Sequence, residues 1–238
     1  AGHEFKRSLK RPFFYVLLAG YTFITLLTFW HYYALTREQL TTLTVASFLV
    51  HPTFYIMHFL FLFLAPLLAM GTLAKEQSQH TMPLLLMSPL GHGQIVLAKL
   101  LAVLGQGIIL LLPTLMIPLI TRLMGWHGGI AFFAHYLALI LTVAVYLMLG
   151  IMISSFTKHQ LLAAFGSILL LVFFMIMAAQ ALNFASLPLG KLVRYITMIY
   201  HFERVSSGLL ATSDLIYFAS ALGIPFYITV KSLDRRWW

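Results

Sequence analysis

The chain has 238 residues, of which 61% are hydrophobic and only 9% are charged, and its net charge is +9. Soluble domains carry about 25% charged residues, so this composition excludes an ordinary water-soluble fold. The absence of cysteine excludes disulfides, thiolate metal sites and a cysteine nucleophile within these residues. The basic residues lie at the ends of apolar runs rather than in one patch, which argues against a nucleic-acid partner.

Six apolar runs are long enough to cross a bilayer, which takes roughly 20 helical residues. We therefore predict an all-α polytopic membrane protein with spans at residues 13–33, 54–73, 95–121, 130–155, 161–182 and 215–233. Pro113 and Pro118 predict a kink or local break in the third span, and Pro225 lies within the sixth. No small-x-small cleavage site follows the first run, so we expect a retained span rather than a signal peptide.

The distribution of Lys and Arg predicts the orientation of the spans. If both termini lie on one side of the membrane, that side holds ten of these residues and the opposite side holds five. Because cytoplasmic loops carry the excess of positive charge, we expect both termini in the cytoplasm.

Three connecting segments are longer than simple turns. Residues 1–12 contain a short basic stretch that suits a helix lying on the inner leaflet. Residues 74–94 form most of the longest cytoplasmic connection, which is half apolar, and residues 183–214 form an amphipathic outer segment for which we expect one or two short helices. Thr212, Ser213 and Asp214 supply an N-cap for the last span. No internal repeat is evident, so we expect a single membrane domain over residues 1–238.

The sequence contains no phosphate-binding loop, because Gly190-Lys191 is followed by Leu and no glycine stands at Walker A spacing. ATP hydrolysis by that route is therefore not expected in this chain. All six acidic residues lie in loops or near span ends. Proton- or sodium-coupled carriers keep an ionisable group near the membrane midplane, so this arrangement disfavours such a carrier. His58 and His135 remain the candidates for titratable groups within spans.

The remaining polar residues give little support for other chemistry. The ten histidines are dispersed, with no HxxxH or HExxH pair, so we predict no metal site. Ser167 has no partnering acid, which disfavours an intramembrane hydrolase. Gln106 and Gln180 lie within spans. Interhelical hydrogen bonding is the simpler interpretation of these two residues, and a place on a cargo path is the alternative.

The most informative segment is 66–100, which reads PLLAMGTLAKEQSQHTMPLLLMSPLGHGQIVLAKL. It resembles the coupling segment of ABC-2 type permeases, which has a glutamate-rich turn, a Gly-Thr, a Leu-Leu pair, a Ser-Pro and a span that opens with Ile-Val-x-x-Lys. The matching residues are Glu76, Thr81, Leu84, Leu85, Ser88, Pro89, Ile95, Val96 and Lys99. His80 stands where the family commonly has glycine, and Pro83 where it commonly has glutamate. A proline there fits best in the first turn of a short helix.

The resemblance extends along almost the whole chain. The opening residues 5–14 are similar to the elbow helix and first span of that family, with Phe5, Lys6, Arg7, Lys10 and Arg11 on the elbow helix. The tail is similar to the gliding-motility-type and nitrous-oxide-reductase-maturation-type permeases, through His201-Phe202, Ser207-Gly208-Leu209, and the stretches 214–218 and 233–237.

The resemblance implies a mechanism. Two permease chains, identical or different, would pair in the lipid of a bacterial cytoplasmic (inner) membrane, and each would receive a separate cytoplasmic ATPase that holds ATP and Mg. This chain would then not be an enzyme itself. The ATPase would press on the elbow helix and on a short coupling helix, which would act as a lever. The coupling residues implied are Glu76, Thr81, Met82, Leu84, Leu85, Ser88 and Pro89.

Three hypotheses for function remain at this stage. The first is an exporter whose cargo is hydrophobic or lipid-linked, because the surfaces available to a cargo are apolar. The second is a scaffold or mechanotransmitter that passes ATP-driven motion to a periplasmic partner without carrying cargo. The outer segment is short for holding a large partner, which favours transport. The third is an intramembrane enzyme or metal handler, which the dispersed histidines disfavour.

Overall fold

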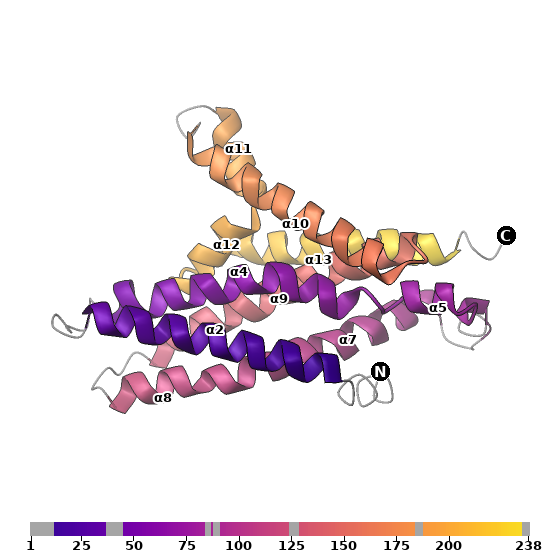
Figure 1. The fold of residues 1–238 in the computed structure, drawn as a ribbon. Helices are drawn as coiled ribbons and strands as arrows, with labels where there is room; N and C mark the ends of the chain where they lie inside the picture. The colour runs from indigo at the N-terminus through magenta and orange to yellow at the C-terminus, as the bar shows by residue number, and fades with distance from the viewer. Residues whose placement is uncertain are drawn as a thin grey trace.

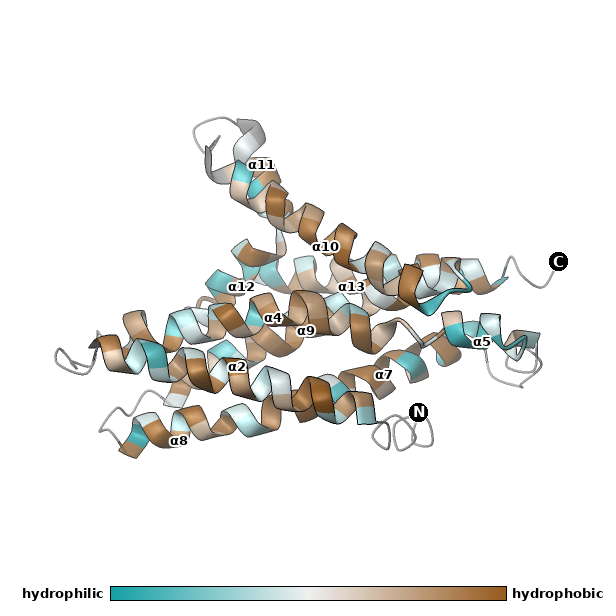
Figure 2. Ribbon diagram, viewed as in Figure 1, coloured by the Kyte–Doolittle hydropathy of each residue, from teal (hydrophilic) through white to brown (hydrophobic). Residues whose placement is uncertain are grey.

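The computed structural model describes residues 12–36, 45–83, 87, 91–123, 129–183 and 188–234, and every regular element within them is helical. Six helical stretches are long and apolar enough to cross a membrane. They are Pro12–Leu35, Ser47–Ser78, His92–Leu123, Gly129–Phe156, Gln160–Ala181 and Thr212–Asp234. The prediction of an all-α polytopic fold with six spans is therefore confirmed, and Figure 2 shows that the long helices are mostly hydrophobic.

Each span contains one or more helices. The first span is α2 (Pro12–Thr36), and the second contains η2 (Val45–Val50), α4 (His51–Ala69) and α5 (Ala74–Ser78). The third contains α7 (His92–Leu111), η3 (Leu112–Leu115) and α8 (Met116–Leu123), and the fourth is α9 (Gly129–Phe156). The remainder comprises α10 (Gln160–Asn183), α11 (Pro188–Ile196), α12 (Met198–Ser206) and α13 (Thr212–Asp234).

The third span is broken where its prolines predicted. Helix α7 ends at Leu111, and the four residues Leu112–Leu115, which include Pro113, form a 3₁₀ turn before α8 resumes the span. Pro118 lies in the first turn of α8, where a backbone N–H has no intrahelical partner to lose.

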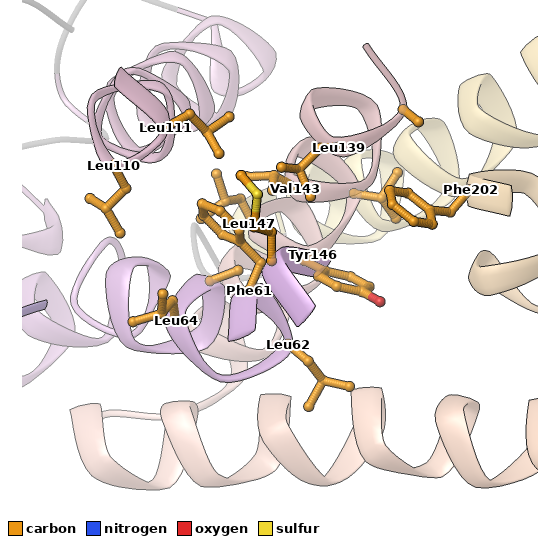
Figure 3. Close-up of a cluster of buried hydrophobic side chains, with 14 of the residues drawn as sticks. Phe61, Leu62, Leu64, Leu110, Leu111, Leu139, Val143, Tyr146, Leu147 and Phe202 are labelled. Carbon is orange, nitrogen blue, oxygen red and sulfur yellow. The ribbon is translucent and has the colours of Figure 1, made fainter. Parts of the chain in front are cut away.

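Helix α9 lies at the centre of the bundle and packs against α4, α7, α10, α12 and α13. Its most apolar stretch is 67% buried, against 22% for the corresponding stretches of α2, α10 and α13. Figure 3 shows the core that results, in which Phe61 of α4 and Val143 and Leu147 of α9 lie between Leu110 of α7 on one side and Phe202 of α12 on the other. Peripheral helices are thus organised around one buried helix.

Small residues allow α4 and α9 to approach closely. A Cβ added at Gly150 would lie 2.6 Å from the Cβ of Ala69 and 3.8 Å from the backbone of Pro66. No real side chain tolerates a contact of 2.6 Å, so glycine is required for this separation of the two helices. Close approach through small residues is a usual means of helix association in membranes, where apolar surface alone gives little driving force.

The bundle has two distinct ends. The start of α2, the end of α13 and α5 lie at one end, which we call the α5 end, while α12 and α8 lie toward the other, the α12 end (Figure 1). The first and last spans thus begin and end on the same side. Helices α11 and α12 confirm the one or two short helices predicted for residues 183–214. Of the predicted cap, Asp214 Oδ2 accepts a hydrogen bond from Ala211 N at 3.1 Å.

Candidate functional site

The break between α4 and α5 is held by one serine of α9. Ser154 Oγ accepts hydrogen bonds from Leu73 N at 3.2 Å and Ala74 N at 2.9 Å, and donates one to Met70 O at 3.0 Å. These three bonds use the full capacity of a hydroxyl group, which is one donor and two acceptor positions. A single side chain therefore satisfies three backbone groups at the break and fixes the start of the coupling segment to α9.

A second contact to α9 comes from α5 itself. The buried Gln77 donates a hydrogen bond from Nε2 to Ser155 O at 2.9 Å. Ser155 stands next to the last residue of α9, where backbone carbonyls lack an intrahelical partner. The glutamine thus caps the end of α9 while it positions α5.

An ion pair joins α5 to α7. Lys99 Nζ donates to Glu76 Oε1, and the two side chains are only 6% and 21% exposed. Both residues belong to the sequence pattern that indicated coupling, but their contact with each other was not predicted. In an apolar environment each charge depends on the other, because removing one leaves a buried charge without compensation.

The ion pair lines a cavity of about 400 Å³ at the α5 end. The cavity is bounded by Glu76 and Thr81 of the coupling segment, by Lys99 and Gln106 of α7, and by the first turns of α2. Gln106 therefore lies on the same cavity as the coupling residues, whereas Gln180 lies on the exposed side of α10 and does not line it. The two glutamines proposed for a cargo path do not share this site.

Helix α5 ends in a Schellman motif. Thr81 N donates to Glu76 O at 3.0 Å and His80 N donates to Gln77 O at 3.4 Å, which are the two bonds that define this motif. The motif requires a left-handed backbone at the residue just after the helix, which is His80, and His80 has a φ of 55°. Glycine is the residue that adopts this conformation without steric cost. The requirement explains why glycine suits this position and marks His80 as a strained substitute.

A helical turn follows the motif. Met82 is buried, Met82 and Pro83 have helical backbone, and Met87 N donates to Pro83 O at 2.9 Å. Pro83 thus lies in a first turn, as expected from its missing N–H. The other predicted coupling and elbow residues lie outside the described residues. They are Leu84, Leu85, Ser88, Pro89, Phe5, Lys6, Arg7, Lys10 and Arg11.

A buried cluster of ionisable side chains at the α12 end was not predicted from the sequence. His201 Nδ1 lies 2.7 Å from Asp214 Oδ1, and Arg204 Nη2 lies 3.6 Å from Asp214 Oδ2. The other ring nitrogen of His201 lies 2.8 Å from Tyr195 O. Both ring nitrogens therefore face oxygen acceptors, and only a doubly protonated imidazole donates to both. His201 and Asp214 both belong to the tail that resembles the family, but that resemblance gave no indication that they pair.

Comparison with known proteins gives one clear match. A family model described as ABC-2 family transporter protein matches residues 1–232. The match includes the coupling segment, the buried cluster, the first five candidate spans and all but the last two residues of the sixth, so it agrees with the resemblance noted in the sequence. The comparison with curated proteins found no match.

Proposed function

We propose that this chain, which belongs to the ABC-2 family of transporter proteins, exports a hydrophobic or lipid-linked cargo. Membership of that family makes the chain a permease subunit of an ABC transporter. A separate ATPase binds at the α5 end. It holds ATP and Mg and supplies the energy of ATP hydrolysis. A second permease chain, identical or different, completes the pathway. In this proposal the α5 end and both termini face the cytoplasm of a bacterial cell, and residues 1–238 act as one membrane domain.

The observation that supports this proposal is the polar attachment of the coupling segment to two spans. Glu76 attaches α5 to α7 through Lys99, and Ser154 and Gln77 attach the same region to α9. A force on α5 is thereby passed to the central helix rather than absorbed in a loose connection. Leu84 and Leu85 are assigned to the groove of the ATPase, as their sequence pattern predicts.

The test is a reconstitution of the full-length permease with its ATPase in proteoliposomes, with ATP hydrolysis and movement of a fluorescent lipid measured together. We expect Glu76→Gln to reduce ATP-driven lipid movement by about tenfold, while hydrolysis continues. The substitution removes the charge that pairs with Lys99, and breaking a buried pair costs about 3 kcal/mol. Charge reversal in Glu76→Lys with Lys99→Glu should restore part of the coupling. Lys158→Gln is the matched control, because Lys158 is exposed between α9 and α10 at the same end.

The results separate the proposal from its alternatives. If the Glu76→Gln variant moves as much lipid per ATP hydrolysed as the wild type does, the contact of Glu76 with Lys99 does not transmit the force. If no ATPase binds the permease, the exporter proposal fails.

The mechanotransmitter alternative also has a supporting observation, because α9 contacts α5 near one end and α12 near the other. It would be favoured if hydrolysis depends on Glu76 while no hydrophobic cargo moves.

A further inference from the structure

A second cavity, of about 420 Å³, lies between α10 and α13 in the half of the bundle toward the α12 end. Both helices pack against α9 and make little contact with each other, and α4, α9 and residues 195–199 supply the other walls. Figure 1 shows α10 leaning away from the rest of the bundle toward α11. Met175 of α10 and Ile224 of α13 line the cavity and are also exposed on the outside of the bundle. The cavity therefore opens sideways between two spans.

The cavity has about the depth of one membrane leaflet. Along α13 its lining runs from Tyr217 to Pro225, and eight helical residues rise about 12 Å. The hydrocarbon core of one leaflet is about 15 Å thick, which is half of the bilayer core. Tyr217 lies near the start of the last span and Pro225 lies near its middle. The cavity thus runs from the membrane surface at the α12 end toward the midplane, as an acyl chain does.

The wall of the cavity suits an acyl chain, because four of its hydroxyl groups are already bonded within the protein. Thr197, Ser220 and Tyr217 each donate to a backbone carbonyl, at 2.6, 2.8 and 2.8 Å. Tyr146 OH lies 3.1 Å from His58 Nε2. No Asp, Glu, Lys or Arg is among the described residues that line the cavity. A charged group would lose its hydration there without compensation, whereas a hydrocarbon chain has no hydration to lose.

An arginine lies beside this cavity, outside the spans. Arg194 is exposed on α11, and its Cζ is 5.0 Å from the ring centroid of Tyr200. The Tyr200 ring is 6.2 Å from the ring of Tyr195, which lines the cavity. Arg204 lies over the same Tyr200 ring, at 5.5 Å, but it also approaches Asp214 Oδ2 at 3.6 Å. Arg194 forms no ion pair within the described part of the chain, so its charge is available to a ligand.

These two features correspond to the two parts of a phospholipid. The planar fork of an arginine matches phosphate oxygens, and the cavity matches an acyl chain in polarity and depth. The arginine lies at the surface end of the cavity, which is where the phosphate of a lipid lies relative to its chains. We propose that Arg194 and the cavity form a binding site for one phospholipid, with its phosphate at Arg194 and one acyl chain between α10 and α13. The site belongs to a single chain and does not depend on the proposed export function.

Binding is tested by photolabelling the full-length protein in maltoside micelles without ATPase. The probe is phosphatidylglycerol that carries a diazirine on one acyl chain, and the comparator is diacylglycerol with the same chains. We expect saturable labelling of peptides from α4, α9, α10 and α13. The phospholipid should bind about fivefold more tightly, because a basic residue near the membrane surface contributes about 1 kcal/mol toward an anionic lipid. Inorganic phosphate should not displace it, since phosphate alone has no chain to fill the cavity.

Arg194→Gln tests the site of the phosphate. This variant should lose the fivefold preference for the phospholipid, while labelling by diacylglycerol stays as in wild type. Arg122→Gln is the matched control, because Arg122 is also exposed toward the α12 end but lies on α8, which lines no part of the cavity.

Ala221→Phe tests the site of the acyl chain. Ala221 lines the cavity on α13, so a phenyl ring there occupies part of the space that the chain needs. Labelling by both probes should fall about tenfold, which corresponds to about two methylene groups that are no longer buried. Ala219→Phe on the same helix is the control, because Ala219 is exposed and does not line the cavity.

Several outcomes would overturn the proposal. They are equal binding of the two probes in wild type, a preference that survives Arg194→Gln, displacement by inorganic phosphate, and labelling that Ala221→Phe leaves unchanged. Absence of labelling, together with a disulfide between two Ile224→Cys chains, would show that a second permease chain covers the cavity instead. Glu76→Gln should bind the phospholipid as wild type does, so failure of binding and failure of coupling are distinguishable.

Discussion

The two ends of α13 each carry a histidine–aspartate pair, and the pairs differ in burial. His201 and Asp214 are both 0% exposed, whereas His92 and Asp234 are 26% and 39% exposed. Water can replace either partner of the exposed pair, so that pair contributes little to stability. The buried pair has no such substitute, because no water reaches either side chain and each depends on the other for its hydrogen bond. The same chemistry thus gives a fixed contact at the α12 end and a contact that opens at little cost at the α5 end.

This difference matches the role proposed for the α5 end. A region that receives force from an ATPase must change its contacts, and the α5 end has an exposed pair between α7 and α13. The α12 end instead has a buried pair between α12 and α13. Helix α9 contacts both regions, which makes it the element through which movement at one end affects the other.

The largest effect is expected from Asp214→Asn. The substitution leaves His201 and Arg204 near a neutral amide in a fully buried position, and the expected loss of stability is about 3–5 kcal/mol. Thermal unfolding of the purified protein in detergent measures it.

Asp234→Asn is the matched control at the other end of the same helix. Its partners, His92 and Lys231, remain in contact with water, so a loss of no more than about 1 kcal/mol is expected. Equal effects of the two substitutions would show that burial does not distinguish the pairs, and the comparison between the two ends would fail.

A smaller effect is expected from Gly150→Ala, which tests the connection between the ends. The added methyl group would meet Ala69 at 2.6 Å and force α4 and α9 apart. Overpacking of this kind costs about 1–3 kcal/mol, seen as a lower unfolding temperature and weaker coupling. Gly20→Ala on α2 is the control, because a Cβ there meets nothing within 4 Å and alanine is the better helix former. Similar destabilisation by both would argue against a special role for the α4–α9 contact.

The sequence predicted what depends on local chemistry. Apolar length placed the six spans within a few residues, except that the second extends further at both ends, and Pro113 marked the break in the third. The pairings escaped prediction, because Glu76–Lys99 and His201–Asp214 join residues 23 and 13 positions apart. Nothing in the sequence states which helices face each other, so Asp214 was predicted as a cap without its buried partners. The role of Gly150 was missed for the same reason. The roles of the predicted coupling residues stay predictions.

The smallest effect should come from His80→Gly, and here the expected sign is a gain. A side chain in the left-handed region costs about 1–2 kcal/mol, while glycine loses about 0.5–1 kcal/mol more backbone entropy on folding. The net gain of about 0.5–1 kcal/mol corresponds to about 2 °C in unfolding temperature for a chain of this size. Ser78→Gly is the control, because Ser78 is exposed within α5 and has no need of a positive φ, so glycine there should destabilise. If both substitutions lower the unfolding temperature, the Schellman motif does not strain His80. If His80→Gly raises stability and leaves coupling unchanged, the strain is incidental to the mechanism; a fall in coupling would instead make the strained turn part of the lever.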